Sequence, residues 1–228
     1  MNETTPGTAV PSRDVAVLFD LDGTLVDSNY LHVHAWWEAF GAAGHEVSGR
    51  DVHHAIGRPA ADLVETLLGH PDQAVVDGHD ERWAALRPRA QAYRGAGELL
   101  RACAARGWRV VWATSGSPED IAAFRALLAA DDVVHAVISS SDVERGKPHP
   151  DVVLAALEAA GVGPQDAVLV GDTVWDAQAA RAAGVASIGL LAGGLCEQAL
   201  RDAGAVDVLD APADLLADLD RLDKIVRR

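Results

Sequence analysis

Two aspartates, Asp20 and Asp22, lie one residue apart at the end of an apolar run that begins near Val15. The run is rich in β-branched residues, which predicts a buried strand, and Gly23 directly after the acids allows a sharp turn. Both carboxylates can then reach one small volume at the carboxyl end of the strand. Carboxylates held this close repel each other unless a cation or a shared proton lies between them. The pair therefore indicates a metal site, acid–base chemistry or both.

Polar clusters also follow three later apolar runs, at the point where each predicted strand ends. In a parallel sheet these ends share one edge, and such sheets bind ligands at that edge. We therefore expect the four clusters to form one site. Besides the first two aspartates, its expected members are Thr114, Ser115 and Gly116 after the second strand, Lys147 after the third, and Asp172 and Asp176 after the fourth.

The residue types at this expected site favour phosphoryl transfer. Oxygen-only ligands suit a hard cation, and no His or Cys grouping lies beside them, which disfavours zinc and favours Mg²⁺. The turn Thr114–Gly116, followed by a helix start at Pro118, offers N–H groups and hydroxyls to an anion. Lys147 adds a positive charge, and a carboxylate can act as the nucleophile.

Alternating strands and helices must position these side chains. Apolar runs that alternate with amphipathic segments predict an α/β fold, in which helices cover both faces of a parallel sheet. The later strands are expected at 108–114, 135–140, 167–172 and 185–190, with a short edge strand at 206–209. The helices between them are expected at 97–106, 118–130, 150–160 and 175–183, with one amphipathic helix at the end of the chain.

Helical spacing replaces the strand pattern directly after Ser28. Helices are expected at 29–43, 48–56, 60–68 and 72–92, and this region has no strand-like run. We read 29–92 as an all-helical insertion after the first strand, with a core domain made of 13–28 and 93–228. Residues 1–12 lack the basic and apolar regions of a signal peptide and are predicted to form a disordered lead.

Composition narrows the range of partners and compartments. The 228 residues are 49% hydrophobic and 23% charged, as expected for a soluble globular protein with a full core. No run approaches the roughly 18 apolar residues of a membrane span. The net charge of −15 argues against a nucleic-acid or anionic-membrane partner. Cys103 and Cys196 are predicted to be reduced, buried thiols, which favours the cytoplasm. We expect a monomer or homodimer.

Four segments, DLDGTLVDS, ATSG, GKPHPD and GDTVWD, resemble in order and spacing the four motifs of the haloacid dehalogenase superfamily. The resemblance covers nearly the whole chain. It is greatest to the branch of phosphoglycolate phosphatase and β-phosphoglucomutase, in which a small α-helical cap follows the first motif. The resemblance implies a Rossmann-like core, with the helical segment 29–92 as the cap.

The resemblance also implies roles for single residues. Asp20 would be the nucleophile that forms an aspartyl-phosphate, and Asp22 would protonate the leaving alkoxide and then deprotonate the hydrolytic water. Lys147 would orient Asp20 and screen its charge. Dehalogenases resemble this pattern but lack an acid at the second aspartate position, so the pattern favours phosphate chemistry. Thr114 with the amides of Ser115 and Gly116 would hold the phosphoryl oxygens, and Asp20, Asp172 and the carbonyl of Asp22 would bind Mg²⁺ with support from Asp176.

Two residues of the insertion are candidates for substrate binding. His32, in the run HVHAW, could point toward the site from the first helix, and Arg58 lies in the Gly-Pro loop IGRPAADL. Alternatively, His32 is a helix-surface or hinge residue and Arg58 is a solvated loop residue. The aspartate pair, Asp20 and Asp22, also has a plainer interpretation as turn-forming residues after a strand.

The function predicted from these observations is a cytoplasmic, Mg²⁺-dependent phosphatase. Its substrate would be a small phosphorylated metabolite, such as phosphoglycolate or a sugar phosphate. The alternative is a phosphomutase of the β-phosphoglucomutase type, which is disfavoured because the last motif begins with Gly-Asp where mutase relatives more often have Glu-Asp. A further alternative is a non-catalytic binding protein on the same fold.

Overall fold

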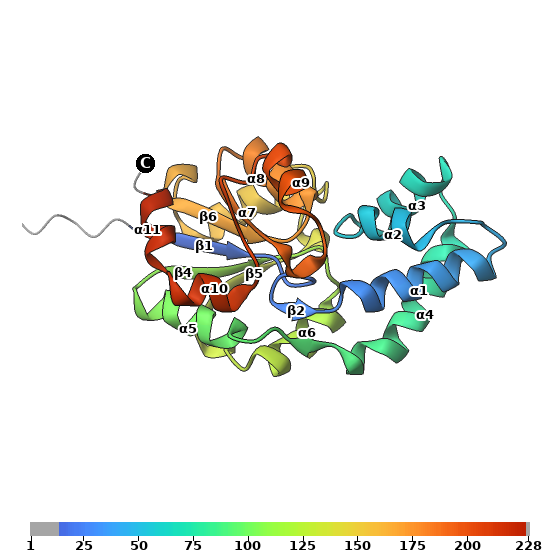
Figure 1. Cartoon of the computed structure of the whole chain (residues 1–228), viewed down its shortest axis with the longest axis horizontal. Coiled ribbons are helices and arrows are strands. Elements are labelled where there is room, and N and C mark those ends of the chain that lie inside the picture. The colour runs from blue at the N-terminus through green and yellow to red at the C-terminus, as the bar shows by residue number, and fades with distance from the viewer. Residues whose placement is uncertain (1–13, 227–228) are drawn as a thin grey trace, which may run out of the picture.

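One six-stranded sheet forms the centre of the protein (Figure 1). The computed structural model describes residues 14–226, so the lead predicted at 1–12 lies outside the described residues. All neighbouring strands in this sheet are parallel, and β1 lies in the interior of the sheet, with a hydrogen-bonded strand on each side. The strand order is β5 (Val134–Ile138), β4 (Arg109–Ala113), β1 (Ala16–Phe19), β6 (Ala167–Gly171), β7 (Ala186–Leu190) and β8 (Asp207–Leu209).

Helices cover both faces of the sheet, which confirms the predicted α/β fold (Figure 1). The alternation of side chains along β1 assigns the faces: Val17 and Phe19 belong to one buried cluster, and Ala16 and Leu18 to another. The first cluster includes residues of α5 (Ala96–Ala105), α6 (Pro118–Leu128), α10 (Pro212–Ala217) and α11 (Asp220–Val226). The second includes residues of α7 (Asp151–Ala160) and α8 (Val174–Ala182), and α9 (Glu197–Ala203) packs beside α8.

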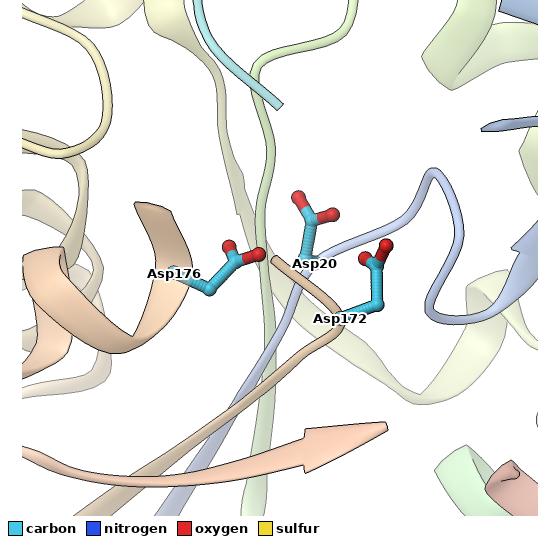
Figure 2. Close-up of side chains that lie close together, drawn as sticks. All are labelled: Asp20, Asp172 and Asp176. Carbon is cyan, nitrogen blue, oxygen red and sulfur yellow. The ribbon is translucent and has the colours of Figure 1, made fainter. Parts of the chain in front are cut away.

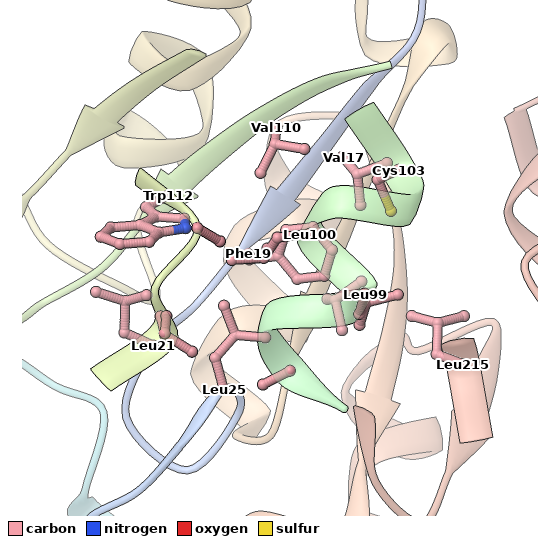
Figure 3. Close-up of a cluster of buried hydrophobic side chains, with 14 of the residues drawn as sticks. Val17, Phe19, Leu21, Leu25, Leu99, Leu100, Cys103, Val110, Trp112 and Leu215 are labelled. Carbon is pink, nitrogen blue, oxygen red and sulfur yellow. The ribbon is translucent and has the colours of Figure 1, made fainter. Parts of the chain in front are cut away.

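The turn after β1 is anchored in the first cluster. Leu21 and Leu25 are fully buried there, close to Phe19 and Trp112 (Figure 3). Because neighbouring side chains of an extended segment point to opposite sides, burial of Leu21 turns the two flanking aspartates away from this core. Apolar packing therefore fixes the part of the chain that presents the acids.

A helical insertion, residues 29–86, lies beyond the carboxyl end of β1 (Figure 1). It contains α1 (Asn29–Ala42), α2 (Gly49–Ala55), α3 (Ala60–Leu68) and α4 (Gln73–Leu86). Two short antiparallel strands, β2 (Val26–Asp27) and β3 (Gln91–Ala92), link it to the core, with Val26 opposite Ala92 and Asp27 opposite Gln91.

The prediction of an unbroken helix over 72–92 is wrong at its end. The α-helix stops at Leu86, one 3-10 turn follows at Arg87–Arg89, and the chain then becomes extended. Pro88 explains the stop, because it has no N–H to continue the α-helical hydrogen bonds and its ring crowds the preceding turn. The region 29–92 therefore includes the two residues of β3, which the sequence pattern did not reveal.

Two smaller expectations also need correction. The last part of the chain forms two short helices, α10 and α11, where one was predicted. Cys196 is exposed, because it precedes α9 at the surface, whereas Cys103 is buried as predicted. No helix within residues 14–226 is both long and apolar enough to span a membrane.

The buried position of Leu100 on α5, in the cluster that includes Val17 and Phe19, predicts a large loss of stability when its side chain is shortened. Leu100 is fully buried, so Leu100→Ala is expected to lower the free energy of unfolding by about 3 kcal/mol through lost burial and the cavity left behind. Leu154→Ala is the matched control, because Leu154 is 48% exposed on α7 and should change that free energy by less than about 0.5 kcal/mol. Urea denaturation measures both values, and equal losses would contradict the assigned core.

Candidate active site

Three buried carboxylates, those of Asp20, Asp172 and Asp176, gather where β1 and β6 end (Figure 2). We call them the carboxylate cluster. Each offers one oxygen atom within 4.8 Å of the others. Asp20 follows β1, Asp172 follows β6, and Asp176 lies in the first turn of α8. The parallel sheet therefore brings together three acids that are up to 156 residues apart in the sequence, between Asp20 and Asp176.

Lys147 lies among these acids, as the sequence predicted. Its Nζ donates to Asp20 Oδ1 at 2.6 Å and lies 2.6 Å from Asp176 Oδ1. The lysine is only 1% exposed, so its charge acts in a poorly solvated space. Burial opposes its charged form, but the nearby carboxylates of Asp176 and Asp20 outweigh that effect and raise the pKa of Lys147.

The carboxylate of Asp176 both caps a helix and contacts Lys147. Its Oδ2 accepts from the N–H and the hydroxyl of Thr173, while the hydroxyl of Thr173 accepts from the Asp176 N–H at 3.2 Å. This reciprocal pair is a capping box at the start of α8. The other oxygen, Oδ1, faces Lys147. The helix cap therefore aims one carboxylate oxygen into the carboxylate cluster.

Asp172 is held by donors from the segment after β1. Thr24 Oγ1 donates to its Oδ1 at 2.8 Å, and Asn29 Nδ2 donates to its Oδ2 at 2.7 Å. Gly23 makes room for this arrangement: its φ is +73°, and a Cβ at that position would lie 2.3 Å from Asp172 Oδ2. The Asp-Gly-Thr sequence after β1 therefore also orders the acid after β6.

The electrostatics of the carboxylate cluster favour a bound cation. Burial, with repulsion from Asp176 and Asp22, raises the pKa of Asp20 to about 7 although Lys147 opposes the shift. Burial and the charges of Asp176 and Asp20 raise the pKa of Asp172 well above its usual range. Three ionised acids and one lysine leave two excess negative charges, which a divalent cation would offset. The donor set is made of oxygen atoms and so fits a hard metal ion.

Asp22 points away from the carboxylate cluster. Its Oδ1 accepts from Ser28 Oγ at 2.5 Å and lies 3.2 Å from His32 Nε2. Ser28 precedes α1, and His32 lies within that helix. The two acids of the first motif are therefore separated: Asp20 faces Lys147, and the carboxylate of Asp22 faces the helical insertion. The side chain of Asp22 does not join the carboxylate cluster, which leaves its backbone carbonyl as the predicted metal contact.

Thr114, Ser115 and Gly116 lie where β4 ends, beside the aspartates. Thr114 is buried, and its Oγ1 accepts from the Gly116 N–H at 3.0 Å. Ser115 Oγ donates to the carbonyl oxygen of Gly57 in the insertion at 3.0 Å. The amide of Gly116 and the hydroxyl of Ser115 are therefore engaged within the protein in this structure, which the motif did not indicate.

A cavity of about 570 Å³ separates the aspartates from the helical insertion. Asp20, Asp22, His32 and Arg58 all line it, so four residues predicted from distant segments meet around one space. The guanidinium of Arg58 lies 3.8 Å from the ring centre of Trp175, which belongs to the fourth motif. The Nε of Arg58 is buried and makes no hydrogen bond with the described residues.

Other cavity residues were not anticipated from the sequence. Asp120 accepts from Trp83 Nε1 at 2.6 Å and from Arg87 at 3.1 Å, and it also caps α6 through Ser117. It therefore ties the end of the insertion to the core. His79 bridges His32 and the surface of the insertion. The one sequence signal for His79 is spacing: His79 and Trp83 repeat the four-residue interval of His32 and Trp36.

Comparisons with known proteins agree with this geometry. The family described as haloacid dehalogenase-like hydrolase matches residues 15–184. Validoxylamine A 7'-phosphate phosphatase from Streptomyces hygroscopicus subsp. limoneus is 32% identical over 179 residues, 76% of this chain and 84% of that protein. Phosphoglycolate phosphatase from Pseudomonas putida is 32% identical over 188 residues, 78% of this chain and 69% of that protein.

A solved structure, described as a hydrolase from Pseudomonas syringae, matches this fold with a TM-score of 0.86 and 32% identity. The match covers 92% of this chain and 99% of the other. The four motifs meet at one sheet edge here, and the matched family region contains all of them. The chain therefore belongs to the haloacid dehalogenase-like hydrolase family.

Proposed function

We propose that this protein is a Mg²⁺-dependent phosphatase that hydrolyses a sugar-sized phosphate monoester through an aspartyl-phosphate on Asp20. The separation of the first two acids carries this proposal. Asp20 Oδ1 lies 2.6 Å from Lys147, whereas Asp22 Oδ1 lies 3.2 Å from His32 of the helical insertion. This difference in partners supports Asp20 as the group that attacks phosphorus and Asp22 as the acid beside the leaving group.

The reaction divides into two displacements. In the first, an oxygen of Asp20 bonds to phosphorus as the ester bond breaks, and Asp22 gives its proton to the leaving oxygen. In the second, water bonds to phosphorus as the bond to Asp20 breaks, and Asp22 takes the proton of that water. Free alcohol and phosphate leave, and both aspartates return to their starting states. Thr114 and the amide of Ser115 orient the phosphoryl oxygens, and the amide of Gly116 joins them by exchanging its bond to Thr114 Oγ1 for one to the phosphoryl group. Lys147 offsets the charge of these oxygens.

Mg²⁺ is the proposed metal. Asp20, Asp172 and the backbone carbonyl of Asp22 would hold it, with Asp176 supporting from the side of Lys147. When bound, the ion supplies positive charge that offsets the carboxylates and the charge on the phosphoryl group.

The helical insertion acts as a cap in this proposal. It closes the cavity from the side opposite the carboxylate cluster, and the hydrogen bond from Ser115 to Gly57 holds its loop against the phosphate-binding turn. The insertion makes a second contact with the core, in which His53 Nε2 lies 3.0 Å from the carbonyl oxygen of Gly193. Closure of this kind excludes bulk water from the reacting groups. The cytoplasm remains the proposed compartment.

The cavity favours a sugar-sized, uncharged leaving group over glycolate or phosphate. Its volume of about 570 Å³ exceeds the needs of a two-carbon acid. Beyond the phosphate-binding residues it is lined by three acids, Asp80, Glu119 and Asp120, and by two bases, Arg58 and Arg87. Arg87 is already paired with Asp120. A second anion would therefore meet excess negative charge, while hydroxyl groups can pair with Asp80, Glu119 and Arg58.

Replacing the nucleophile tests the proposed chemistry. Asp20→Asn is expected to lower kcat on p-nitrophenyl phosphate by at least about 1000-fold, because the amide cannot form the phosphoenzyme. Phosphate release measures the rate, and circular dichroism checks the fold. Asp27→Asn is the control, since Asp27 lies outside the cavity on β2 and should keep near-normal activity. Near-normal turnover by Asp20→Asn would contradict the assignment.

Metal removal tests the carboxylate cluster in two ways. Chelation with EDTA should abolish phosphate release, and added Mg²⁺ should restore it. Saturating Mg²⁺ should also raise the melting temperature, since an ion at 100 times its Kd stabilises the folded state by about 2.7 kcal/mol. Asp172→Asn should reduce both responses because it removes a charged ligand. Full activity in EDTA, or equal thermal shifts for both proteins, would count against a resident metal.

A substrate panel tests the proposed leaving group. Hexose and pentose phosphates should show at least about tenfold higher kcat/KM than phosphoglycolate or pyrophosphate. Arg58→Ala should raise KM for the best sugar phosphate about tenfold, the expected cost of a lost charged hydrogen bond. Arg50→Ala is the control and should leave KM unchanged, because Arg50 is exposed on α2. Free phosphate is the expected product; conversion of β-glucose 1-phosphate to glucose 6-phosphate would instead support a mutase.

A further inference from the structure

A chain of hydrogen-bonded side chains runs from Asp22 to the surface of the helical insertion. His32 Nε2 lies 3.2 Å from Asp22 Oδ1, and His32 Nδ1 lies 3.2 Å from His79 Nε2. The last contact joins His79 Nδ1 to Asp80 Oδ1 at 3.0 Å. The side chain of His79 is only 7% exposed, whereas that of Asp80 is 68% exposed. Two histidines from different helices therefore connect a partly buried acid of the site, Asp22, with an exposed one, Asp80.

Two tryptophans fix the orientation of the histidine rings. Trp36 stacks on His79 with the ring centres 3.8 Å apart and the planes 12° from parallel. Trp83 stacks on His32 with the ring centres 3.7 Å apart. Both pairs arise because α1 and α4 pack side by side and each carries a histidine four residues before a tryptophan. Each histidine is therefore held by the tryptophan of the other helix.

The direction of each hydrogen bond in this series follows from Asp80, its exposed member. The carboxylate of Asp80 only accepts, so His79 Nδ1 carries a hydrogen. Burial lowers the pKa of His79, with a smaller contribution from neighbouring His32, and favours the neutral ring. In a neutral ring with Nδ1–H, Nε2 is an acceptor, so His32 Nδ1 must donate to it. The hydrogen of His32 therefore lies on Nδ1, and its Nε2 faces Asp22 Oδ1 at 3.2 Å.

We propose that His79 is a positioning residue for proton transfer by Asp22: with Asp80, it fixes the tautomer and the orientation of His32. This inference rests on the proposed phosphatase function. As the ester bond breaks, Asp22 gives its proton to the leaving oxygen while His32 holds the carboxyl group of Asp22 in place. Asp22 recovers a proton from the attacking water as the bond between Asp20 and phosphorus breaks, so the chain returns to its starting arrangement.

The dependence on the leaving group tests this role. His79→Leu keeps most of the volume but removes the acceptor, and it should lower kcat for an alkyl phosphate such as glucose 6-phosphate about 10- to 100-fold with little change in KM. Hydrolysis of p-nitrophenyl phosphate should fall less than about threefold, because nitrophenolate leaves without a proton. His79→Gln, which restores an acceptor oxygen, should recover most of the loss. Equal losses on both substrates would overturn the proposal.

Asp80, the exposed member of this series of hydrogen bonds, can be replaced without disturbing the core. Asp80→Asn should also lower kcat selectively for the alkyl phosphate without raising its KM, since an amide no longer defines the tautomer of His79. A higher KM with unchanged kcat would report only a lost contact between the sugar and Asp80, which lines the cavity, and would contradict the inference. Glu81→Gln is the matched control, because it removes the same charge at the next position of α4, where the side chain is exposed. Asp80→Asn behaving as Glu81→Gln on both substrates would contradict the inference.

Nitrogen-15 NMR of the histidine rings separates this inference from the proposed function. Both His32 and His79 should carry their hydrogen on Nδ1 in the wild-type protein, and His32 should lose this preference in His79→Leu. An Nε2–H tautomer of His32 in the wild type would overturn the inference whatever the enzyme hydrolyses. A wild type with these tautomers that releases phosphate from no ester would refute the phosphatase function and, with it, the catalytic role of His79.

Discussion

The crowding of negative charge where β1 and β6 end is the constraint on which the rest of the site depends. Asp20, Asp172 and Asp176 are each at most 5% exposed, and Lys147 is the cation in contact with two of them. Carboxylates in such a position are costly unless they are paired or hydrogen-bonded. The surrounding chain supplies that compensation through donors such as Thr24 and through the tight turn at Gly23. The excess negative charge that remains favours binding of a hard cation.

Apolar packing allows this arrangement to persist. Leu21 and Leu25 are buried on the opposite side of the same turn, and the core around Phe19 holds the backbone from which the acids project. Alternation along the chain gives the segment two faces, one that contributes to the core and one that carries charge. The segment after β1 is therefore both a structural anchor and the centre of the site.

The sequence was sufficient to place the residues at strand ends, because strand position follows from local periodicity and parallel strands share an edge. Asp20, Lys147 and Asp172 meet for that reason. Features that depend on packing between helices were not predictable in this way. His79 meets His32 only because α1 and α4 pack together, and Asp120 meets Trp83 across the boundary between the insertion and the core. The end of α4 at Leu86 was not predicted because the apolar residues keep helical spacing past Pro88.

The pairing of β2 with β3 means that the chain enters and leaves the helical insertion at the same place. Asp27 lies opposite Gln91 in an antiparallel pair, a spacing that a two-residue turn can bridge in a hairpin. The path of the core chain is thus nearly continuous without the insertion, and no core strand has to move when the inserted segment changes in length. Evolution could therefore exchange the insertion, and with it the choice of substrate, while the phosphate chemistry of the core stayed intact.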